Sequence, residues 1–111
     1  MGVNIAGIYK KLVSIDIQDI SYFYSDGRIN LFKTKNNRKF IVDYTMDELE
    51  EMLNPQDYFR VNRSFYISVP SVEKIDDYFG NRLILQLLPP TDKEVVVSRE
   101  KVMAFKRWMG K

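Results

Sequence analysis

The chain has 111 residues, with 17 lysines and arginines against 15 acids, and it contains neither cysteine nor histidine. This composition excludes disulfide bonds and cysteine-based zinc sites, and it removes the general base that most enzymes use near neutral pH. Because 45% of the residues are hydrophobic and 14% aromatic, we expect one folded domain over residues 1–111 (core about 12–108) that is not an enzyme and needs no cofactor or metal.

The sequence shows no sign of a membrane or secretion signal. No apolar run approaches the roughly 20 residues that span a bilayer, and Met1–Lys11 lacks the apolar stretch of a signal peptide. Since the absence of cysteine also suits a reducing compartment, we expect no membrane association and a cytoplasmic location.

The first third of the chain is typical of a meander of short strands, because apolar residues alternate with period two. The expected strands are Leu12–Ile17, Ile20–Ser25, Ile29–Thr34 and Lys39–Tyr44. Ile20, Tyr22 and Tyr24 are expected on one face of the second strand. Asp26-Gly27 and Asn36-Asn37 predict the turns, since glycine and asparagine tolerate positive φ.

The spacing then changes to that of a helix. Thr45-Met46-Asp47-Glu48 has the pattern of a capping box, and apolar residues recur at helical spacing over Met46–Leu53. Asn54-Pro55 ends this helix, because the residue before proline avoids the α conformation. Its outer face is acidic and should repel anionic groups such as phosphates.

The second half again predicts mostly strands. Tyr58–Ser64 has no clear period; the expected strands that follow are Phe65–Val69, Val72–Tyr78, Leu83–Leu88 and Glu94–Val97. The middle pair forms a hairpin around Gly80-Asn81. Ser98 is expected to cap a C-terminal helix whose buried stripe contains Val102, Phe105 and Met109. The fold class is therefore mostly β.

Charge is segregated along the chain. Gly27–Val42 holds five bases and no acid, whereas Asp43–Asp57 holds six acids and no base. Such segregation can build a basic face that attracts phosphates. It is equally consistent with solvated charges on strand edges, which discourage aggregation.

Four motifs occur in an order that is typical of one family. Tyr58–Pro70 reads YFRVNRSFYISVP, and Ile15–Phe23, Thr45–Leu53 and Val96–Val102 accompany it. Together they resemble the centre motif, opening strand pair, acidic helix and final helix start of the LytTR DNA-binding domain. The centre-motif match falls on Phe59, Arg60, Val61, Arg63, Ser64, Phe65 and Ile67. Asn62 replaces the family's usual histidine, and Ser68 stands where asparagine is frequent.

The resemblance implies a LytTR-like elongated stack of antiparallel β-sheets with two short flanking helices. It implies sequence-specific binding of double-stranded DNA through loop side chains in major grooves, by the output domain of a bacterial transcription regulator of the response-regulator kind. The partners it implies are double-stranded DNA, a receiver domain in a longer parent protein, and a second copy of the domain on repeated sites.

The family's DNA contacts carry over to three places in this chain. These places hold Arg28 and Asn30, then Asn62 and Arg63, then Arg99 and Lys101, with Glu100 between the last two. The arginine fork matches guanine, and asparagine can read adenine. Four further bases are expected to contact phosphates: Lys33, Lys35, Arg38 and Lys39. Arg60 is expected to pair with the acidic helix.

Two other functions remain open on the sequence alone. A single-stranded nucleic-acid binder would use aromatic rings as stacking platforms, for which the candidates are Tyr22, Tyr24, Phe32 and Tyr58. A protein-interaction β module would show no salt-dependent binding to any DNA. Competition between duplex and single-stranded DNA separates these alternatives from the LytTR interpretation.

Overall fold

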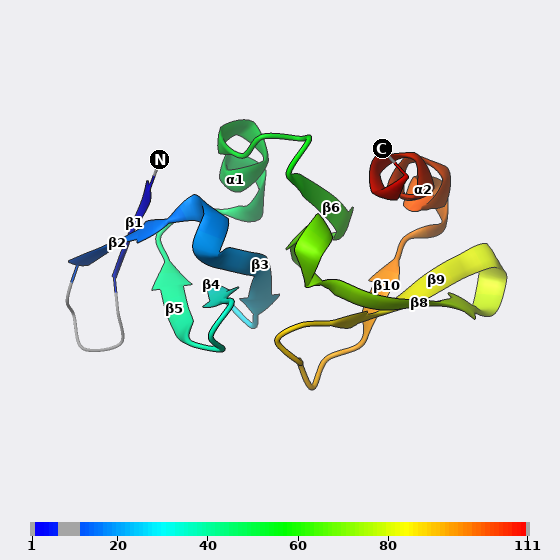
Figure 1. Cartoon of the computed structure of the whole chain (residues 1–111), viewed down its shortest axis with the longest axis horizontal. Helices are drawn as coiled ribbons and strands as arrows, with labels where there is room; N and C mark the ends of the chain where they lie inside the picture. Colours follow the sequence, from blue (N-terminus) through cyan, green and yellow to red (C-terminus); the bar gives the residue numbers. More distant parts are fainter. Residues whose placement is uncertain (1, 7–11, 111) are drawn as a thin grey trace.

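The structure of this chain, a computed structural model, describes residues 2–6 and 12–110. The molecule is elongated, with extents of 42 × 26 × 24 Å. Two antiparallel sheets lie one after the other along the long axis, and both α-helices lie along the same side (Figure 1). Most of Met1–Lys11, the segment expected to lack a signal peptide, lies outside the described residues.

The two sheets account for most of the regular structure. The larger sheet has the order β2 (Leu12–Asp16), β1 (Gly2–Ala6), β5 (Lys39–Val42), β4 (Ile29–Thr34), β3 (Ile20–Asp26), β7 (Phe65–Ser68) and β6 (Tyr58–Asn62). The smaller sheet has the order β10 (Val95–Val97), β9 (Arg82–Leu87) and β8 (Val72–Tyr78). This confirms the predicted mostly β fold with two short helices, α1 (Met46–Met52) and α2 (Val102–Met109).

The predicted turns and the first helix cap are confirmed. Gly27 (φ 64°), Asn37 (φ 65°), Gly80 (φ 65°) and Asn81 (φ 58°) all adopt positive φ at the expected turns. At α1, the Thr45 hydroxyl accepts a hydrogen bond from the Glu48 amide at 3.0 Å, and the Glu48 carboxylate accepts one from the Thr45 amide at 2.9 Å. Local backbone chemistry alone therefore determined these positions.

The predicted cap at Ser98 is wrong. The Ser98 side chain makes no capping hydrogen bond. The chain first forms a 3₁₀ turn, η4 (Arg99–Lys101), in which the Lys101 amide donates to the Ser98 carbonyl at 2.8 Å, and α2 begins only at Val102. Of the stripe expected on α2, Phe105 is buried and Val102 and Met109 are half-buried against the core. Trp108 is buried beside them.

Two strands, β1 and β6, were not predicted from the sequence, and two β-bulges disturb the predicted alternation of side chains. β1 lies in the N-terminal segment, and β6 lies in the stretch without clear period. In β6 the register shifts between Arg60 and Asn62, so alternation is lost there. A second shift between Ile20 and Tyr22 moves Ile20 to the opposite core cluster from Tyr22 and Tyr24, which corrects the expectation that the three share one face.

Strands β3 to β7 of the larger sheet carry buried side chains on both faces. On the α1 side, neighbouring strands place Tyr66, Phe23, Phe32 and Phe40 directly opposite one another in register. On the other side, a second cluster packs the larger sheet against the smaller one and α2. The Tyr22 hydroxyl reaches across and donates to the Pro89 carbonyl at 2.7 Å. Because apolar packing covers both faces, binding side chains are left to the turns at the strand ends.

Candidate nucleic-acid interface

The three places predicted to contact DNA lie beside one another, although they are far apart in sequence. The Ser25 amide donates to the Ser64 carbonyl at 2.9 Å, and the Ser98 amide donates to the Val61 carbonyl at 3.0 Å. These bonds place the β6–β7 turn between the β3–β4 turn and η4. We call this area, formed by residues 26–28, 62–64 and 98–101, the three-loop surface.

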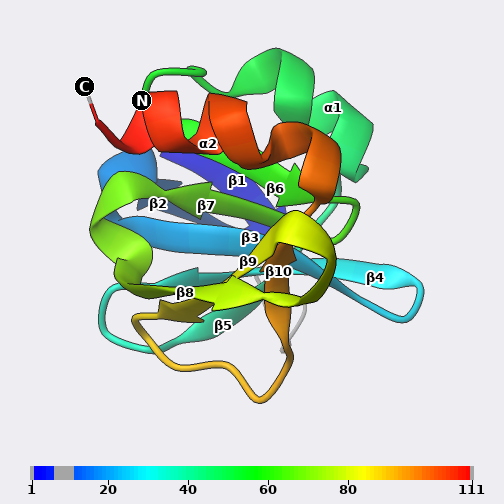
Figure 2. The same cartoon turned by 90° about the vertical axis from the view of Figure 1, so that its right-hand side faces the viewer.

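The β3–β4 turn forms one end of the three-loop surface, and its tip projects from the right of the molecule in Figure 2. Arg28 is exposed there, while the Asp26 carboxylate forms an ion pair of 3.3 Å with the Lys93 ammonium group. The loop that follows β9 therefore supports this tip and neutralises its one acid.

Arg63 has the geometry expected of a residue that binds DNA. Its side chain is exposed, and its guanidinium forms no hydrogen bond or ion pair with any residue in the described ranges. It lines a surface hollow of about 490 Å³ together with Ser25, Asn62, Lys93 and Ser98. A planar donor that no protein group occupies is available for a base edge or a phosphate.

Both asparagines of the predicted contact set already serve the fold. The Asn62 amide nitrogen donates to the Val96 carbonyl at 2.7 Å, and its oxygen accepts from the Ser64 amide at 2.7 Å. The Asn30 amide nitrogen donates to the Tyr44 carbonyl at 2.8 Å, and its oxygen accepts from the Ser25 hydroxyl at 2.8 Å. Each side chain keeps one amide hydrogen for a further partner.

At the third place, the two predicted bases, Arg99 and Lys101, have different environments. Arg99 is exposed, as is Glu100. The Lys101 ammonium group instead donates to the Arg60 carbonyl at 3.0 Å, and Lys101 thereby ties η4 to β6. Arg99 is thus the base that this place presents to solvent.

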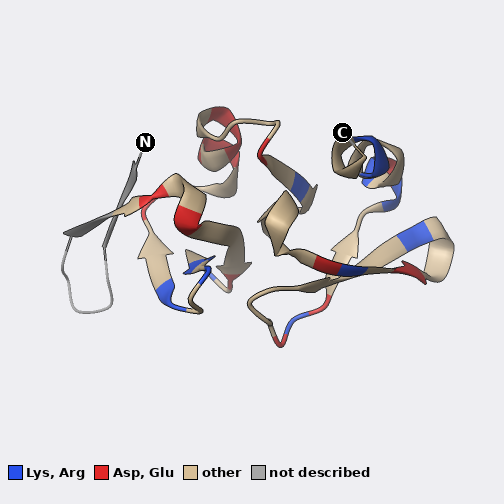
Figure 3. Cartoon of the chain, in the orientation of Figure 1, with Lys and Arg blue, Asp and Glu red and all other residues tan. Residues whose placement is uncertain are grey.

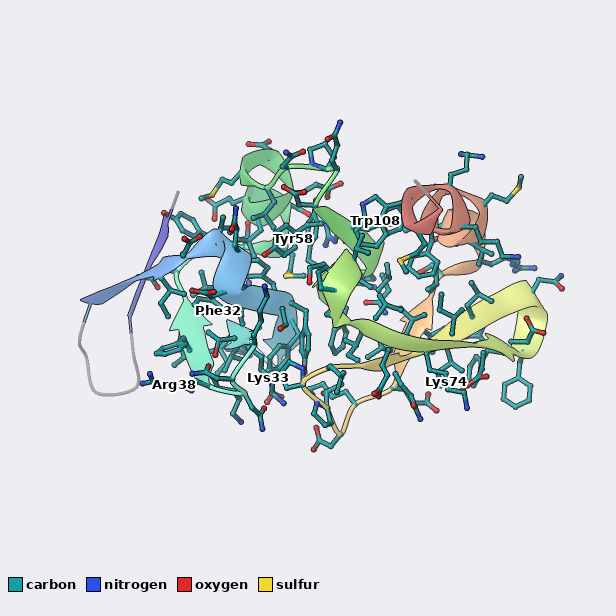
Figure 4. The ribbon with its side chains drawn as sticks, in the orientation of Figure 1. Phe32, Lys33, Arg38, Tyr58, Lys74 and Trp108 are labelled. Carbon is teal, nitrogen blue, oxygen red and sulfur yellow. The ribbon has the colours of Figure 1, made fainter. Side chains whose placement is uncertain are left out.

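The four predicted phosphate contacts lie elsewhere. They belong to the β4–β5 hairpin, whose turn is at the opposite end of β4 from Arg28. The two ends of β4 are about 17 Å apart, because five residue steps of roughly 3.3 Å separate them. Figure 4 shows Lys33 and Arg38 there. The Lys33 ammonium group donates to the Pro90 carbonyl at 2.7 Å, and burial together with the nearby Lys39 lowers the pKa of Lys33. The Arg38 guanidinium stacks on Phe40 at 5.2 Å.

Arg60 pairs with the acidic helix as expected. Its guanidinium lies 2.7 Å from the Asp47 carboxylate and 2.9 Å from that of Glu50, and it also donates to the Arg63 carbonyl at 3.3 Å. Acids gather on α1, whereas bases lie on the β4–β5 hairpin, on β9 and on α2 (Figure 3). Arg60 therefore connects α1 to the β6–β7 turn.

The aromatic rings proposed as stacking platforms are buried, so that expectation is wrong. Tyr22 and Phe32 are 0% exposed, Tyr24 4% and Tyr58 5%. They belong to the two core clusters, and a base cannot reach their faces.

Sequence reasoning missed two bases beside the three-loop surface, Lys93 and Arg82. Lys93 lines the hollow of Arg63, and Arg82 lines a second hollow with Asn62 and Arg99. No local pattern marks either residue, because only the packing of the two sheets brings them there. Within residues 2–6 and 12–110, no group of acids could hold a metal ion, and no helix is long and apolar enough to cross a membrane.

Comparison with known proteins finds one family. The family model described as the LytTr DNA-binding domain matches residues 10–110. The transcriptional regulatory protein YpdB of Escherichia coli (strain K12) is 29% identical over 100 residues, which are 90% of this chain and 40% of that protein. The heme-containing CO-sensing transcriptional regulator RcoM 2 of Paraburkholderia xenovorans (strain LB400) is 30% identical over 106 residues, which are 93% of this chain and 39% of that protein.

The fold is also shared with a solved structure. A LytTr DNA-binding domain from Bacillus cereus superposes with a TM-score of 0.82 at 16% identity, covering 99% of this chain and 97% of that one. The chain thus matches that domain over nearly its whole length, whereas it spans about 40% of the length of the curated relatives.

Proposed function

Because the chain belongs to the LytTr DNA-binding domain family, a family of DNA-binding and not of catalytic domains, we propose that it contacts double-stranded DNA sequence-specifically through the three-loop surface. In this proposal the loop side chains enter major grooves, which present a distinct pattern of donors and acceptors for each base pair. The domain thereby serves as the DNA-binding part of a bacterial transcription regulator.

The observation that carries this proposal is the convergence of three distant segments around the exposed, unoccupied guanidinium of Arg63. Arg63 is the proposed base reader, since its fork matches guanine O6 and N7. Arg28 and Arg99 flank it on the neighbouring loops. Asn62 and Asn30 hold the turns in place and offer their remaining amide hydrogens, and Lys101 contributes positive charge from a fixed position.

The wider assembly is part of the same proposal. The matched relatives are longer than this chain, and we place the domain in a cytoplasmic parent protein in which a receiver domain supplies the signal. Two copies are proposed to bind repeated sites as a homodimer. The two relatives support the regulatory role through their names as transcriptional regulators.

The first experiment is selection of bound duplexes from a random library, followed by competition. We expect a preferred duplex sequence to emerge and to be displaced by duplex DNA far more effectively than by single strands of the same sequence. Preference for single strands would favour the single-stranded binder. Absence of any salt-dependent DNA binding would favour a protein-interaction module instead.

The second experiment assigns Arg63 its role. Arg63→Ala is expected to fold normally, to lose about 1–3 kcal/mol of binding to the selected duplex, and to lose much less on random duplexes. Arg107→Ala is the matched control, because Arg107 is an exposed arginine on α2, outside the three-loop surface and the predicted phosphate contacts. Equal losses on both duplexes would make Arg63 a phosphate clamp, and a large fall in melting temperature would make it structural.

A further inference from the structure

A second surface hollow borders the three-loop surface on the side of the smaller sheet. It has a volume of about 510 Å³ and lies between the β8–β9 tip and η4, with Gly80 and Arg82 on one side and Arg99 and Glu100 on the other. Asn62 lines both this hollow and that of Arg63. The β8–β9 hairpin is not among the segments assigned to DNA above.

The guanidinium of Arg82 is held in a fixed orientation in this hollow. Its Nε atom donates to the Phe79 carbonyl at 2.9 Å, and its Cζ atom lies 5.0 Å from the centroid of the Tyr78 ring. The Tyr78 hydroxyl in turn bonds the Glu94 carboxylate at 3.2 Å. One nitrogen and one face of the guanidinium are thus occupied, while the terminal N–H groups remain available to an acceptor.

The backbone of the tip permits this arrangement. Gly80 and Asn81 both adopt positive φ, at 65° and 58°, so the chain reverses within η3 (Phe79–Asn81) and returns Arg82 to the hollow. A Cβ atom at Gly80 would lie 3.7 Å from the Arg82 Nε atom. That distance is an ordinary van der Waals contact, so it is the positive φ of Gly80, and not lack of space, that favours glycine at this tip.

The charges in the hollow do not cancel. Among the described residues, neither Arg82 nor Arg99 forms an ion pair within 4.0 Å of a carboxylate, and Glu100 is the one acid that lines the hollow. Two guanidinium groups against one carboxylate leave a net positive charge. Planar guanidinium donors match the oxygens of a phosphate group in charge and geometry.

We propose that Arg82 and Arg99 bind one phosphodiester group of the DNA backbone in this hollow, so that the β8–β9 hairpin forms a fourth contact beside the three-loop surface. The inference rests on the proposed function, since it names a further contact for the same ligand. A phosphate contact positions the protein on the duplex and carries no base preference of its own.

The test measures duplex affinity against salt for the whole chain, four single variants and one double variant. Arg82→Ala is expected to weaken binding roughly tenfold on selected and random duplexes alike, and to reduce the slope of log K against log salt by up to about 0.9, the value for one phosphate contact. Arg82→Lys should recover part of the affinity because it keeps the charge. The control is Lys74→Ala, which removes a base from β8 of the same hairpin, 60% exposed and paired with Asp76, and it should match the wild type.

Arg99→Ala keeps the inference testable if Arg82→Ala unfolds the hairpin tip, because Arg99 is exposed and forms no ion pair within the described part of the chain. It too should reduce the slope, and the double variant should reduce it by about 0.9 in all, because both arginines share one phosphate. If folded Arg82→Ala behaves like Lys74→Ala while the wild type binds duplex DNA, the phosphate site is wrong and the proposed function stands. A wild type that binds no duplex at all would overturn both.

Discussion

The side-chain amide nitrogen of Asn62, at the end of β6, lies 2.7 Å from the carbonyl oxygen of Val96 in β10 and donates to it. This bond joins the edge of the larger sheet to the smaller sheet at the three-loop surface. The Asn62 oxygen also fixes the β6–β7 turn through the Ser64 amide at 2.7 Å. A residue predicted as a base reader is therefore first a support for the surface on which Arg63 stands.

Asn62→Ala is expected to lower the free energy of unfolding by about 1–3 kcal/mol, because it leaves half-buried backbone groups without their partners. DNA affinity should fall together with stability, since the turn that carries Arg63 loses its support. Denaturant titration and duplex binding measure the two effects. A variant with unchanged stability and altered base preference would show that Asn62 acts mainly as a base reader.

The ion pairs of Arg60 should stabilise the fold without influencing sequence preference. Arg60→Ala is expected to cost about 1–3 kcal/mol, and Glu50→Ala about 0–1 kcal/mol because that carboxylate is exposed. Glu51→Ala, on the same helix, is the control, since Glu51 forms no ion pair within the described ranges. Thermal melting and duplex selection on each variant check this; a shifted sequence preference in the glutamate variants would place α1 against DNA.

The lysines of the β4–β5 hairpin test how far DNA extends over the molecule. If DNA bends around the larger sheet, Lys35→Ala and Lys39→Ala should each reduce the salt slope by about 0.9 on a long duplex, equally for selected and random sequences. We expect Lys33→Ala to lower the melting temperature as well, because its ammonium group tethers the loop at Pro90. Slopes identical to that of the wild type would confine the contact to the three-loop surface and the neighbouring hollow.

Alkaline pH should destabilise the protein through Tyr58. Its hydroxyl donates to the carbonyls of Ile17 and Ile20, at 2.8 Å each, and burial raises its pKa above the ordinary value of 10.0. A phenol whose pKa rises on folding stabilises the fold below its unfolded pKa, and this contribution is lost as the pH rises through the folded value. The denaturation midpoint should therefore fall above about pH 10.

Tyr58→Phe separates the two parts of that effect. It should cost about 1–2 kcal/mol at neutral pH, since one buried and one half-buried carbonyl lose their donor, and it should make the alkaline fall shallower. Tyr44→Phe is the control, because the Tyr44 hydroxyl forms no hydrogen bond with the described part of the chain. An equally steep fall in Tyr58→Phe would assign the pH dependence to other tyrosines, such as the buried Tyr22.

The sequence by itself determined the features that depend on a few neighbouring residues. Gly27, Asn37 and the Gly80-Asn81 pair specify their turns because positive φ costs these residues little, and Thr45 with Glu48 specifies the start of α1 through reciprocal hydrogen bonds. The order of the four motifs likewise identified the family, which the match over residues 10–110 confirms. Each of these signals depends either on a few neighbouring residues or on several short motifs that occur in a fixed order.

Tertiary structure decided what the candidate residues are free to do. Arg63 and Asn62 are neighbours in sequence, yet the first points to solvent while the second bonds Val96 across the gap between two sheets. Lys33 and Lys101 are likewise occupied by carbonyls of distant segments, and Arg82 and Lys93 reach the interface only because the smaller sheet packs beside it. Polar atoms bond to whichever partner the packing brings within reach, and contacts across more than 30 residues leave no trace in local sequence.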